Sequence, residues 1–455
     1  MGLDGWQSVA LGDVVKIKHG WPFKSELFSD ELAGQPIVVN IGNFEYTGGF
    51  RFESTTLREY RGEYPKEYEL APQDVLLVMT CQTPGGEILG IPGRIPADQR
   101  IYLHNQRMGK VVVTRPDFVL LDFLYWVFLW KDFNQELVST ASGTKILHTS
   151  PGRIEAFKFD LPPLKEQEKI ARILGALDDK IELNRRMNRT LEAMAAALFK
   201  SWFVDFDPVT RNAVGADGRP PLPGMNAETA ALFPSAFQDS EIGPIPEGWM
   251  ISTIGDMVTA VGGSTPSTTN PIYWEGGTLA WATPKDLANL SDPVLLKTER
   301  CITEAGLTQS RSGMLPPGTV LMSSRAPVGY LAITEIPVAI NQGFIAMKCD
   351  KGVPNHYIFC WLHENMDTII AHANGTTFLE ISKANFRPIP ALLPPEPIRE
   401  CFAKMVDKWH AQTVINVQQS HTLARIRDAL LPKLLSGEIR VKATEPRSVA
   451  EQAAV

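Results

Sequence analysis

The sequence contains few cysteines and no long apolar run. Its five cysteines are widely spaced and form no Cys-x-x-Cys pair, which argues against a zinc site or a redox couple. The longest apolar stretch, residues 118–130, has only 13 residues and contains Asp122, so it predicts a buried helix and not a membrane span. The first residues, MGLDGWQSV, lack the basic and then apolar pattern of a leader. We therefore expect a protein of the reducing cytoplasm with no membrane association.

Motifs for catalysis are also missing. The sequence has neither the G-x-x-x-x-G-K-[ST] phosphate loop nor the H-E-x-x-H zinc motif. An amino-methyltransferase would carry an Asn/Asp-Pro-Pro-aromatic tetrapeptide, whereas the string Asn270–Tyr273 lacks the second proline and is interpreted as a turn. The acidic–lysine spacing of a nuclease does not occur in a convincing strand context. The sequence therefore predicts a non-catalytic chain that binds no cofactor and no metal.

An excess of positive charge is absent as well. The formal net charge is −7, and residues 1–160 hold 16 Lys and Arg against 20 Asp and Glu. This balance argues against a protein that coats nucleic acid through a general basic field. Any contact with DNA must come from a local basic face or from basic partner subunits. The length of 455 residues, with 44% hydrophobic and 21% charged residues, predicts a soluble protein of about two to four domains.

The chain is one module written twice. The opening Trp6-x5-Gly12-Asp13 matches Trp249-x5-Gly255-Asp256 at an offset of 243 residues. Further on, PQDVLLVMTCQTP matches PGTVLMSSRAP, HNQRM matches INQGF, and ASGTKIL matches ANGTTFL at an offset of 232. Solenoid units run to about 20–50 residues, so two repeats of this size indicate two duplicated domains and two duplicated helices.

The predicted fold class is α+β, with two tandem mixed α/β domains separated by two long helices that form an antiparallel coiled coil with pseudo-two-fold symmetry. The stretch between the copies is rich in proline and glycine, which is typical of a linker. The predicted parts are a first domain (1–160), a first helical region (161–207), a linker (208–247), a second domain (248–392), a second helical region (393–440) and a disordered tail (441–455).

Each domain ends in Leu-Pro-Pro, after which a long helix is expected. Because proline is tolerated at a helix start and not inside it, Pro163 and either Pro395 or Pro397 mark the starts. Apolar positions then alternate in steps of four and three, which indicates a coiled-coil seam. The seam of the first helix is Ile170, Leu174, Leu177, Ile181, Asn184, Asn188, Leu191, Ala195, Leu198 and Trp202, and the second helix repeats it 232 residues later, from Phe402 to Leu434.

Both seams are polar in the middle, at Asn184 and Asn188 and at Asn416 and Ser420. Antiparallel pairing would place Asn184 against Ser420 and Asn188 against Asn416. We predict that this layer fixes the register of the helices at some cost in stability, so that leucine at both Asn188 and Asn416 would raise stability and loosen register. The alternative is that these positions are solvent-exposed breaks in a poor seam.

The helix pair is expected to act as a spacer. A helix of about 36 residues spans about 54 Å at 1.5 Å per residue. Such a spacing of two different domains suits the reading of two different short DNA segments on one face of the duplex, about one helical turn or more apart.

From Trp6 to about Val441 the chain resembles the specificity subunit of type I restriction–modification systems. The segments LPPLKEQEKIARILGALDDKIELNRRMNRTLEAMAAALFKSWFVDFDP and ALLPKLLSGEIRV are similar to the two conserved helical regions of that family, and the Trp-x5-Gly-Asp openings to the starts of its two target recognition domains. The resemblance implies a subunit that reads a split, asymmetric target in double-stranded DNA. It also implies partners: two adenine methyltransferase subunits that use S-adenosylmethionine, and translocating nuclease subunits that use ATP and Mg²⁺.

Polar loop residues are the candidates for DNA contact, because backbone contacts position a protein and base-edge contacts give specificity. Gln82 and Arg325 are expected in matching places of the two copies, with different hydrogen-bonding character. In the first domain the candidates are Lys16, Lys18, His19, Thr80, Cys81, Gln82, Asn105, Gln106, Arg107, Thr144, Lys145 and His148. In the second domain they are Lys285, Ser323, Ser324, Arg325, Asn341, Gln342, Thr376 and Thr377.

Several of these candidates have a structural alternative. The recurring Asn-Gln pairs can be hydrogen bonders of a turn or core, the loops at Thr144 and Thr376 can be set by backbone geometry, and His19 and His148 can be plain surface residues. A basic face of the first helix is interpreted as solvated, although it could meet a partner: Lys165, Arg172, Arg185, Arg186 and Arg189. The aromatic residues Tyr125, Trp126 and Trp130 are interpreted as core.

Other classes of protein are less favoured. A methyltransferase or nuclease with its own recognition domains would need about 200 further residues, whereas the duplication leaves a 40-residue linker and a 15-residue tail. The duplicated architecture alone would allow a protein-interaction scaffold without a DNA role. A specificity subunit of another multi-subunit restriction–modification type is a further alternative.

Overall fold

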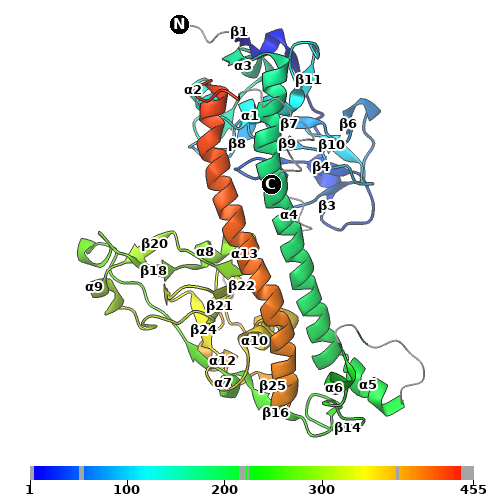
Figure 1. Cartoon of the computed structure of the whole chain (residues 1–455), viewed down its shortest axis with the longest axis vertical. Coiled ribbons are helices and arrows are strands. Elements are labelled where there is room, and N and C mark those ends of the chain that lie inside the picture. The colour runs from blue at the N-terminus through cyan, green and yellow to red at the C-terminus, as the bar shows by residue number, and fades with distance from the viewer. Residues whose placement is uncertain (1–4, 51–55, 215–221, 223–224, 376–378, 442–455) are drawn as a thin grey trace, which may run out of the picture. The chain divides into compact units, whose positions relative to one another are not determined.

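The structure is a computed structural model (Figure 1), and it describes residues 5–50, 56–214, 222, 225–375 and 379–441. The chain divides into two compact units. Unit 1 comprises residues 1–180 and 422–455, and unit 2 comprises residues 181–421. Each unit therefore contains one of the two predicted domains together with a stretch of each long helix.

Unit 1 is built on two sheets. One has the strand order β2-β11-β7-β9 and the other the order β3-β5-β4-β10-β6, and the pairs β1-β13 and β8-β12 lie beside them. The strands are β1 (Gln7–Ala10), β2 (Val15–His19), β3 (Phe28–Ser29), β4 (Ile37–Val39), β5 (Glu59–Tyr60), β6 (Glu69–Leu70), β7 (Val75–Val78), β8 (Thr80–Cys81), β9 (Pro92–Arg94), β10 (Tyr102–His104), β11 (Met108–Val113), β12 (Leu147–His148) and β13 (Lys158–Leu161). The helices are α1 (Leu121–Phe128), α2 (Lys131–Ser139) and α3 (Pro151–Glu155), with 3-10 turns at Leu11–Asp13, Ser25–Leu27, Ile41–Asn43 and Lys66–Tyr68.

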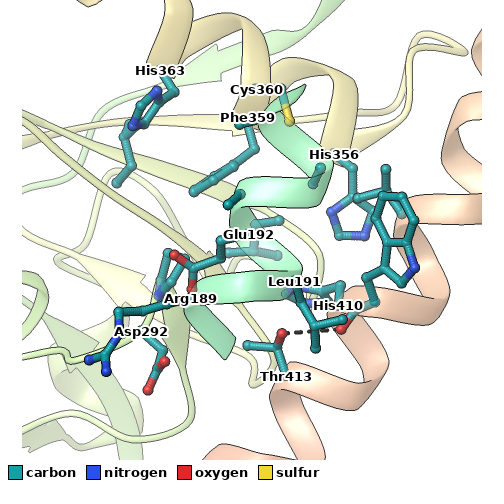
Figure 2. Close-up of a pocket in the computed structure, with 18 of the residues that line it drawn as sticks. Arg189, Leu191, Glu192, Asp292, His356, Phe359, Cys360, His363, His410 and Thr413 are labelled. Atoms are coloured by element: carbon teal, nitrogen blue, oxygen red, sulfur yellow. Dashed lines mark hydrogen bonds between the residues drawn. The ribbon is translucent and has the colours of Figure 1, made fainter. Parts of the chain in front are cut away.

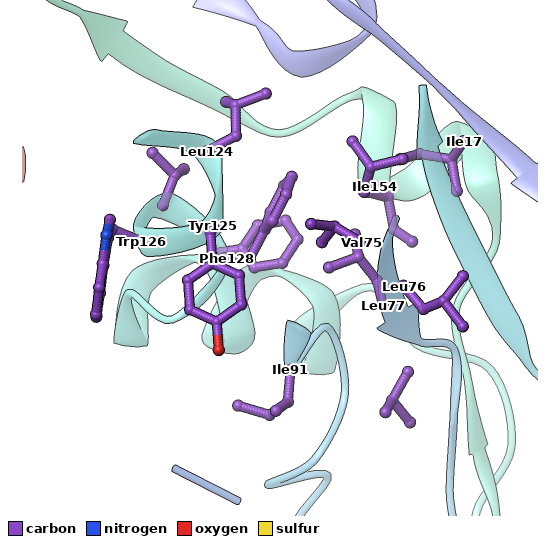
Figure 3. Packing of buried hydrophobic residues seen from close by; sticks show 14 of the residues in the cluster. Ile17, Val75, Leu76, Leu77, Ile91, Leu124, Tyr125, Trp126, Phe128 and Ile154 are labelled. Carbon is purple, nitrogen blue, oxygen red and sulfur yellow. The ribbon is translucent and has the colours of Figure 1, made fainter. Parts of the chain in front are cut away.

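The core of unit 1 forms where β7 meets α1 (Figure 3). All four residues of β7 are buried, which explains why this strand is a continuous apolar run. The predicted helix 118–130 is confirmed in part, because α1 is shorter and a second helix, α2, follows at once. Tyr125 and Trp126 are buried as predicted, whereas Trp130 is partly buried at the edge of the core.

Unit 2 repeats this plan. Its sheets have the orders β17-β24-β21-β22-β19 and β20-β18-β23, with the pairs β14-β15 and β16-β25. The strands are β14 (Phe237–Gln238), β15 (Ile245–Pro246), β16 (Met250–Thr253), β17 (Thr259–Val261), β18 (Leu279–Ala282), β19 (Val294–Leu295), β20 (Arg300–Ile302), β21 (Val320–Ser324), β22 (Val328–Thr334), β23 (Ala339–Ile340), β24 (Phe344–Lys348) and β25 (Pro390–Leu393). The helices are α5 (Asp207–Val214), α6 (Ala227–Ala230), α7 (Ile254–Met257), α8 (Pro284–Ala288), α9 (Glu304–Leu307), α10 (Asn355–Glu364), α11 (Met366–Ala371) and α12 (Lys383–Phe386), with a 3-10 turn at Pro271–Tyr273.

The sheet topology supports the internal duplication. The order β2-β11-β7-β9 of unit 1 recurs as β17-β24-β21-β22 in unit 2, and the antiparallel pair β1-β13 recurs as β16-β25. The parallel pair of β4 and β10 recurs as β18 and β23. Corresponding segments of the two copies therefore occupy corresponding places in their sheets.

The two long helices are α4 (Leu164–Phe203) and α13 (Glu396–Leu435), drawn in green and in orange to red in Figure 1. They begin directly after Pro163 and Pro395, as the proline argument predicted. Within unit 2, Asn184 of α4 donates to Ser420 of α13, four residues before the Asn188–Asn416 contact, so the helices run antiparallel. Most seam positions of α4 are buried: Ile170, Leu174, Ile181, Asn184, Asn188, Ala195, Leu198 and Trp202.

The segment interpreted as a linker is folded in part. It contains α5, α6 and the pair β14-β15. Val209, Phe233 and Ile245 from this segment belong to the hydrophobic cluster of unit 2. Phe233 packs edge-on against Trp202 near the end of α4, with ring centroids 5.1 Å apart. The predicted tail lies almost entirely outside the described residues.

Candidate nucleic-acid interface

Three segments of the first domain meet at one junction. The backbone N–H of Met79, after β7, donates to the carbonyl of Arg107 at 2.9 Å. The N–H of Thr149 donates to the carbonyl of Met79 at 3.0 Å. Beside these bonds, Thr80 Oγ1 and His148 Nδ1 lie 3.1 Å apart. The junction therefore brings together candidate residues from positions 80, 107 and 148.

The second domain builds the same junction with other side chains. The N–H of Ser324 donates to the carbonyl of Gly343 at 2.8 Å, and the N–H of Ile381 donates to the carbonyl of Ser324 at 3.0 Å. Arg325 Nη1 lies 3.7 Å from Glu380 Oε1, and both side chains are partly exposed. An ion pair thus stands where the first domain has a hydroxyl and an imidazole.

The pairing of Gln82 with Arg325 across the two copies is wrong. In the ladders, Val78 pairs with Met108 and Ser323 pairs with Phe344, so Arg325 corresponds to Thr80. The two matched segments differ in length by two residues. Alignment of their last prolines, Pro84 and Pro327, pairs Gln82 with Arg325, whereas alignment of their first prolines, Pro72 and Pro317, gives the pairing seen in the ladders.

The Asn residues of the Asn-Gln pairs make turn bonds. Asn105 Oδ1 accepts from the N–H of Arg107 at 3.0 Å, and Asn341 Oδ1 accepts from the N–H of Gly343 at 2.8 Å. The same bond in both copies favours the structural reading of the two asparagines. Gln342 Oε1, in contrast, accepts from the hydroxyl of Thr265 on an exposed surface.

The remaining candidates separate by exposure. Ser323 and Ser324 are buried in β21. The Ser323 hydroxyl donates to the carbonyl of Pro327 and accepts from the N–H of Tyr330, so this residue has a structural role. Lys16 and Lys285 are exposed but lie in ion pairs with Glu155 and Glu299. Thr376 and Thr377 lie outside the described residues. The exposed candidates in the first domain are Lys18, His19, Gln82, Arg107, Thr144, Lys145 and His148.

The second domain also has an aromatic and basic group that the sequence search missed. The guanidinium of Arg300 lies 3.7 Å from the ring centroid of Trp274 and 5.5 Å from that of Trp281. Arg300 is exposed. The two tryptophans are seven residues apart in sequence and 19 or more residues before Arg300, so no local motif signals the group.

The centre of the helix pair is polar and buried. Asn416 Nδ2 donates to Asn188 Oδ1 at 2.8 Å, and Asn184 Nδ2 donates to Ser420 Oγ at 3.2 Å. Asn184, Asn188 and Asn416 are at most 2% exposed. The alternative of solvent-exposed breaks is therefore wrong for these three residues, and their role in fixing register stays a prediction.

A pocket of about 570 Å³ lies next to this centre within unit 2 (Figure 2). Burial, and then the nearby charge of Asp292, raises the pKa of Glu192 to about 7. Burial and the neighbouring His410 lower the pKa of His356, which also lines the pocket, to about 3. His356 is thus neutral at neutral pH, so its 3.1 Å contact with Asp407 is not an ion pair.

Across the residues that the structure describes, no group of three or more His, Cys, Asp or Glu side chains is placed to hold a metal ion. None of the described helices has the length and apolar character needed to cross a membrane.

The string Asn270–Tyr273 is a turn, as predicted. Asn270 caps the 3-10 turn at Pro271–Tyr273 by accepting from the N–H of Ile272.

Two copies of one mixed α/β domain, joined by paired long helices and carrying different side chains at one equivalent junction, define a two-site recognition protein. The model of the "Type I restriction modification DNA specificity domain" family matches residues 3–193 and 246–424, and the chain belongs to this family. Its function is DNA specificity in type I restriction–modification, as the resemblance implied.

Similar known proteins are specificity subunits of type I restriction enzymes. The chain is 27% identical over 484 residues to the type I restriction enzyme HindI specificity subunit of Haemophilus influenzae, which covers 96% of this chain and 100% of that protein. It is 26% identical over 332 residues to the MjaIX specificity subunit of Methanocaldococcus jannaschii, with 72% and 71% covered. The crystal structure of a type I restriction–modification S subunit from M. genitalium has a similar fold, with a TM-score of 0.53 at 14% identity over 94% of this chain and 96% of that one.

Proposed function

We propose that the chain reads a split, asymmetric DNA target with one half-site for each domain. The observation that carries this proposal is the shared junction with unlike side chains: exposed His148, bonded to buried Thr80, in one copy and Arg325 with Glu380 in the other. Arginine pairs best with guanine, whereas an imidazole presents a different set of donors and acceptors. Two domains on one scaffold with different side chains would read different bases.

Catalysis in this proposal belongs to partner subunits. The chain lends target choice to two methyltransferase subunits that use S-adenosylmethionine and to restriction subunits that use ATP and Mg²⁺, and it has no cofactor site of its own. The exposed basic residues of α4 offer a surface for such partners, with Lys165, Arg172 and Arg186 all exposed. Because the chain carries a net charge of −7, tight DNA binding is assigned to the assembled complex.

The test uses the full chain assembled with its methyltransferase subunits. The complex is incubated with a random-sequence DNA pool and S-adenosylmethionine, and the methylated molecules are sequenced. We expect two short half-sites separated by a spacer of fixed length. A continuous motif, or no enriched motif, would contradict the proposal, and methyl transfer by the chain alone would favour an enzyme.

A domain exchange assigns each half-site. Residues 6–160 are replaced by the first domain of another family member, and the methylated sites are sequenced again. One half-site should change completely while the other and the spacer stay the same. A change in both half-sites would show that the domains do not read independently.

A further inference from the structure

A buried carboxylate of the second domain enters the polar centre of the helix pair. Asn188 Nδ2 donates to Asp292 Oδ1 at 2.9 Å, while Asn188 Oδ1 accepts from Asn416 at 2.8 Å. Both amide groups of the helix pair and the domain carboxylate thus form one continuous chain of hydrogen bonds. Asp292 is only 8% exposed.

The second oxygen of Asp292 is held by its own domain. Asp292 follows α8 and precedes β19, and its Oδ2 accepts from the hydroxyl of Ser291 at 2.8 Å. Its backbone carbonyl accepts from the N–H of Val294 at 2.7 Å. The carboxylate is therefore fixed in the domain by one oxygen and to α4 by the other.

This contact differs in kind from the apolar contacts around it. Apolar burial has no preferred direction, whereas a hydrogen bond to a buried carboxylate has narrow geometry and is costly to leave unmade. One turn further along α4 stands Glu192, a second carboxyl group beside Asp292. One turn earlier stands Asn184, whose amide already donates to Gln419 and Ser420. A shift of the domain by one helical turn would therefore place Asp292 against a second carboxyl group in one direction, and against an amide whose donor is already in use in the other.

We propose that Asp292 is a positioning residue that fixes the seat of the second domain on the helix pair and so sets the spacer length that the complex accepts between half-sites. This inference rests on the proposed function. Asp292 is buried and bonded to α4, so its replacement should act on spacing and leave the base preferences of each half-site unchanged.

The experiment measures spacer choice directly. The half-sites found for the wild-type complex are placed in a DNA library with every spacer length around the natural one, and methylation of each member is counted. Asp292→Ala should raise methylation at spacers one base pair too long or too short about tenfold relative to the natural spacer, because one charge-assisted hydrogen bond is lost. Asp292→Asn keeps an acceptor oxygen for Asn188 and should restore the wild-type spacer preference.

The control is a second buried aspartate of the same domain. Asp286 is also 8% exposed, but its carboxylate accepts only from Thr283 and from the N–H of Glu299 among the bonds described. Asp286→Ala should lower total methylation without altering spacer choice. The inference is overturned if Asp292→Ala keeps the wild-type spacer or if Asp286→Ala relaxes it equally.

A second variant covers the case in which Asp292→Ala does not assemble. The triple variant Asn188→Leu, Asn416→Leu and Asp292→Leu removes the buried charge and both amides of its hydrogen-bond chain, which spares the cost of an unpaired carboxylate and of an unpaired Asn416 amide. It should assemble and accept altered spacers, and an unaltered spacer preference would refute the positioning role. If the wild-type complex itself yields no split motif, the proposed function fails first, and this inference with it.

Discussion

The two domains share a scaffold and carry different side chains at an equivalent junction. In both copies a residue at the end of the central strand, Met79 just after β7 and Ser324 as the last residue of β21, donates its N–H to the residue that follows an Asn-Gln pair. Its carbonyl accepts from a segment before the final strand. On that common frame the first domain carries Thr80 and His148, and the second carries Arg325 and Glu380. Backbone bonds thus preserve the position of a side chain while its chemistry is free to vary, which is what a family of proteins with different targets requires.

The largest expected effect is a loss of stability on substitution at either end of the helix seam, and each substitution should destabilise a different unit. Trp202 and Leu434 are equivalent seam positions, and each is fully or almost fully buried, in the cluster of unit 2 and of unit 1 respectively. Trp202→Ala should cost about 4 kcal/mol and Leu434→Ala about 3 kcal/mol of stability. Hydrogen exchange should show lost protection mainly in unit 2 for the first variant and mainly in unit 1 for the second. Equal loss throughout would mean that the units do not unfold separately.

A pH effect should be confined to unit 2, because the position equivalent to Glu192 in α13 is Ala424. The pKa of Glu192 is raised from 4.5 to about 7, so stability falls as the pH rises from about 4.5 to about 7, and the full cost is present above about pH 7. Glu192→Gln should therefore leave stability unchanged at acid pH and raise it by about 3 kcal/mol at about pH 8.

Chemical denaturation at the two pH values measures this difference. Glu182→Gln is the matched control, because Glu182 lies on the same helix in an exposed ion pair with Arg189. Its effect should be below about 1 kcal/mol at either pH. A pH-independent gain for Glu192→Gln would contradict the raised pKa.

The contrast at the junction predicts a change in specificity for the second half-site. If Arg325 reads a base, Arg325→Ala should reduce discrimination at one base pair of that half-site by about 1–3 kcal/mol. Thr80→Ala at the equivalent place should alter only the first half-site, and by less. Sequencing of methylated DNA from each variant complex separates the effects. If Glu380→Gln reproduces the change made by Arg325→Ala, the ion pair has a structural role and does not read DNA.

The smallest effect is expected for Lys16. Its ammonium lies 3.2 Å from Glu155 and is largely solvent-exposed, so Lys16→Ala should change stability by less than about 1 kcal/mol. Arg107→Ala, at the junction of the same domain, should lower methylation more than Lys16→Ala does. A larger loss for Lys16→Ala would place the DNA contact on β2 and away from the junction.

Much of the fold follows from local rules. The start of α4 follows from Pro163, since proline fits the first turn of a helix. The rule is not strict, because α13 contains Pro432 near its C-terminal end. The helix seam follows from apolar residues spaced alternately four and three positions apart, because those positions share one face of a helix. The shortened α1 and the folded part of the 208–247 segment did not follow, because burial of residues such as Phe233 against Trp202 depends on contacts distant in sequence.

The structure changes the result expected for leucine at Asn188 and Asn416. The seam pattern predicted that leucine at Asn188 and Asn416 would raise stability, since a buried amide pair costs more than an apolar layer. Asn188 also donates to the buried carboxylate of Asp292, 104 residues away. The leucine pair would remove that donor, so a gain in stability is expected only when Asp292 is replaced as well.

The sequence by itself determined the duplication, the two long helices and their antiparallel register, because repeats and periodicity are properties of the chain order. The tertiary structure alone decided which side chains meet: Thr80 with His148, Arg325 with Glu380, and Asp292 with Asn188. These contacts join strands, loops and helices whose separation in sequence carries no period, and only packing brings them within hydrogen-bonding distance.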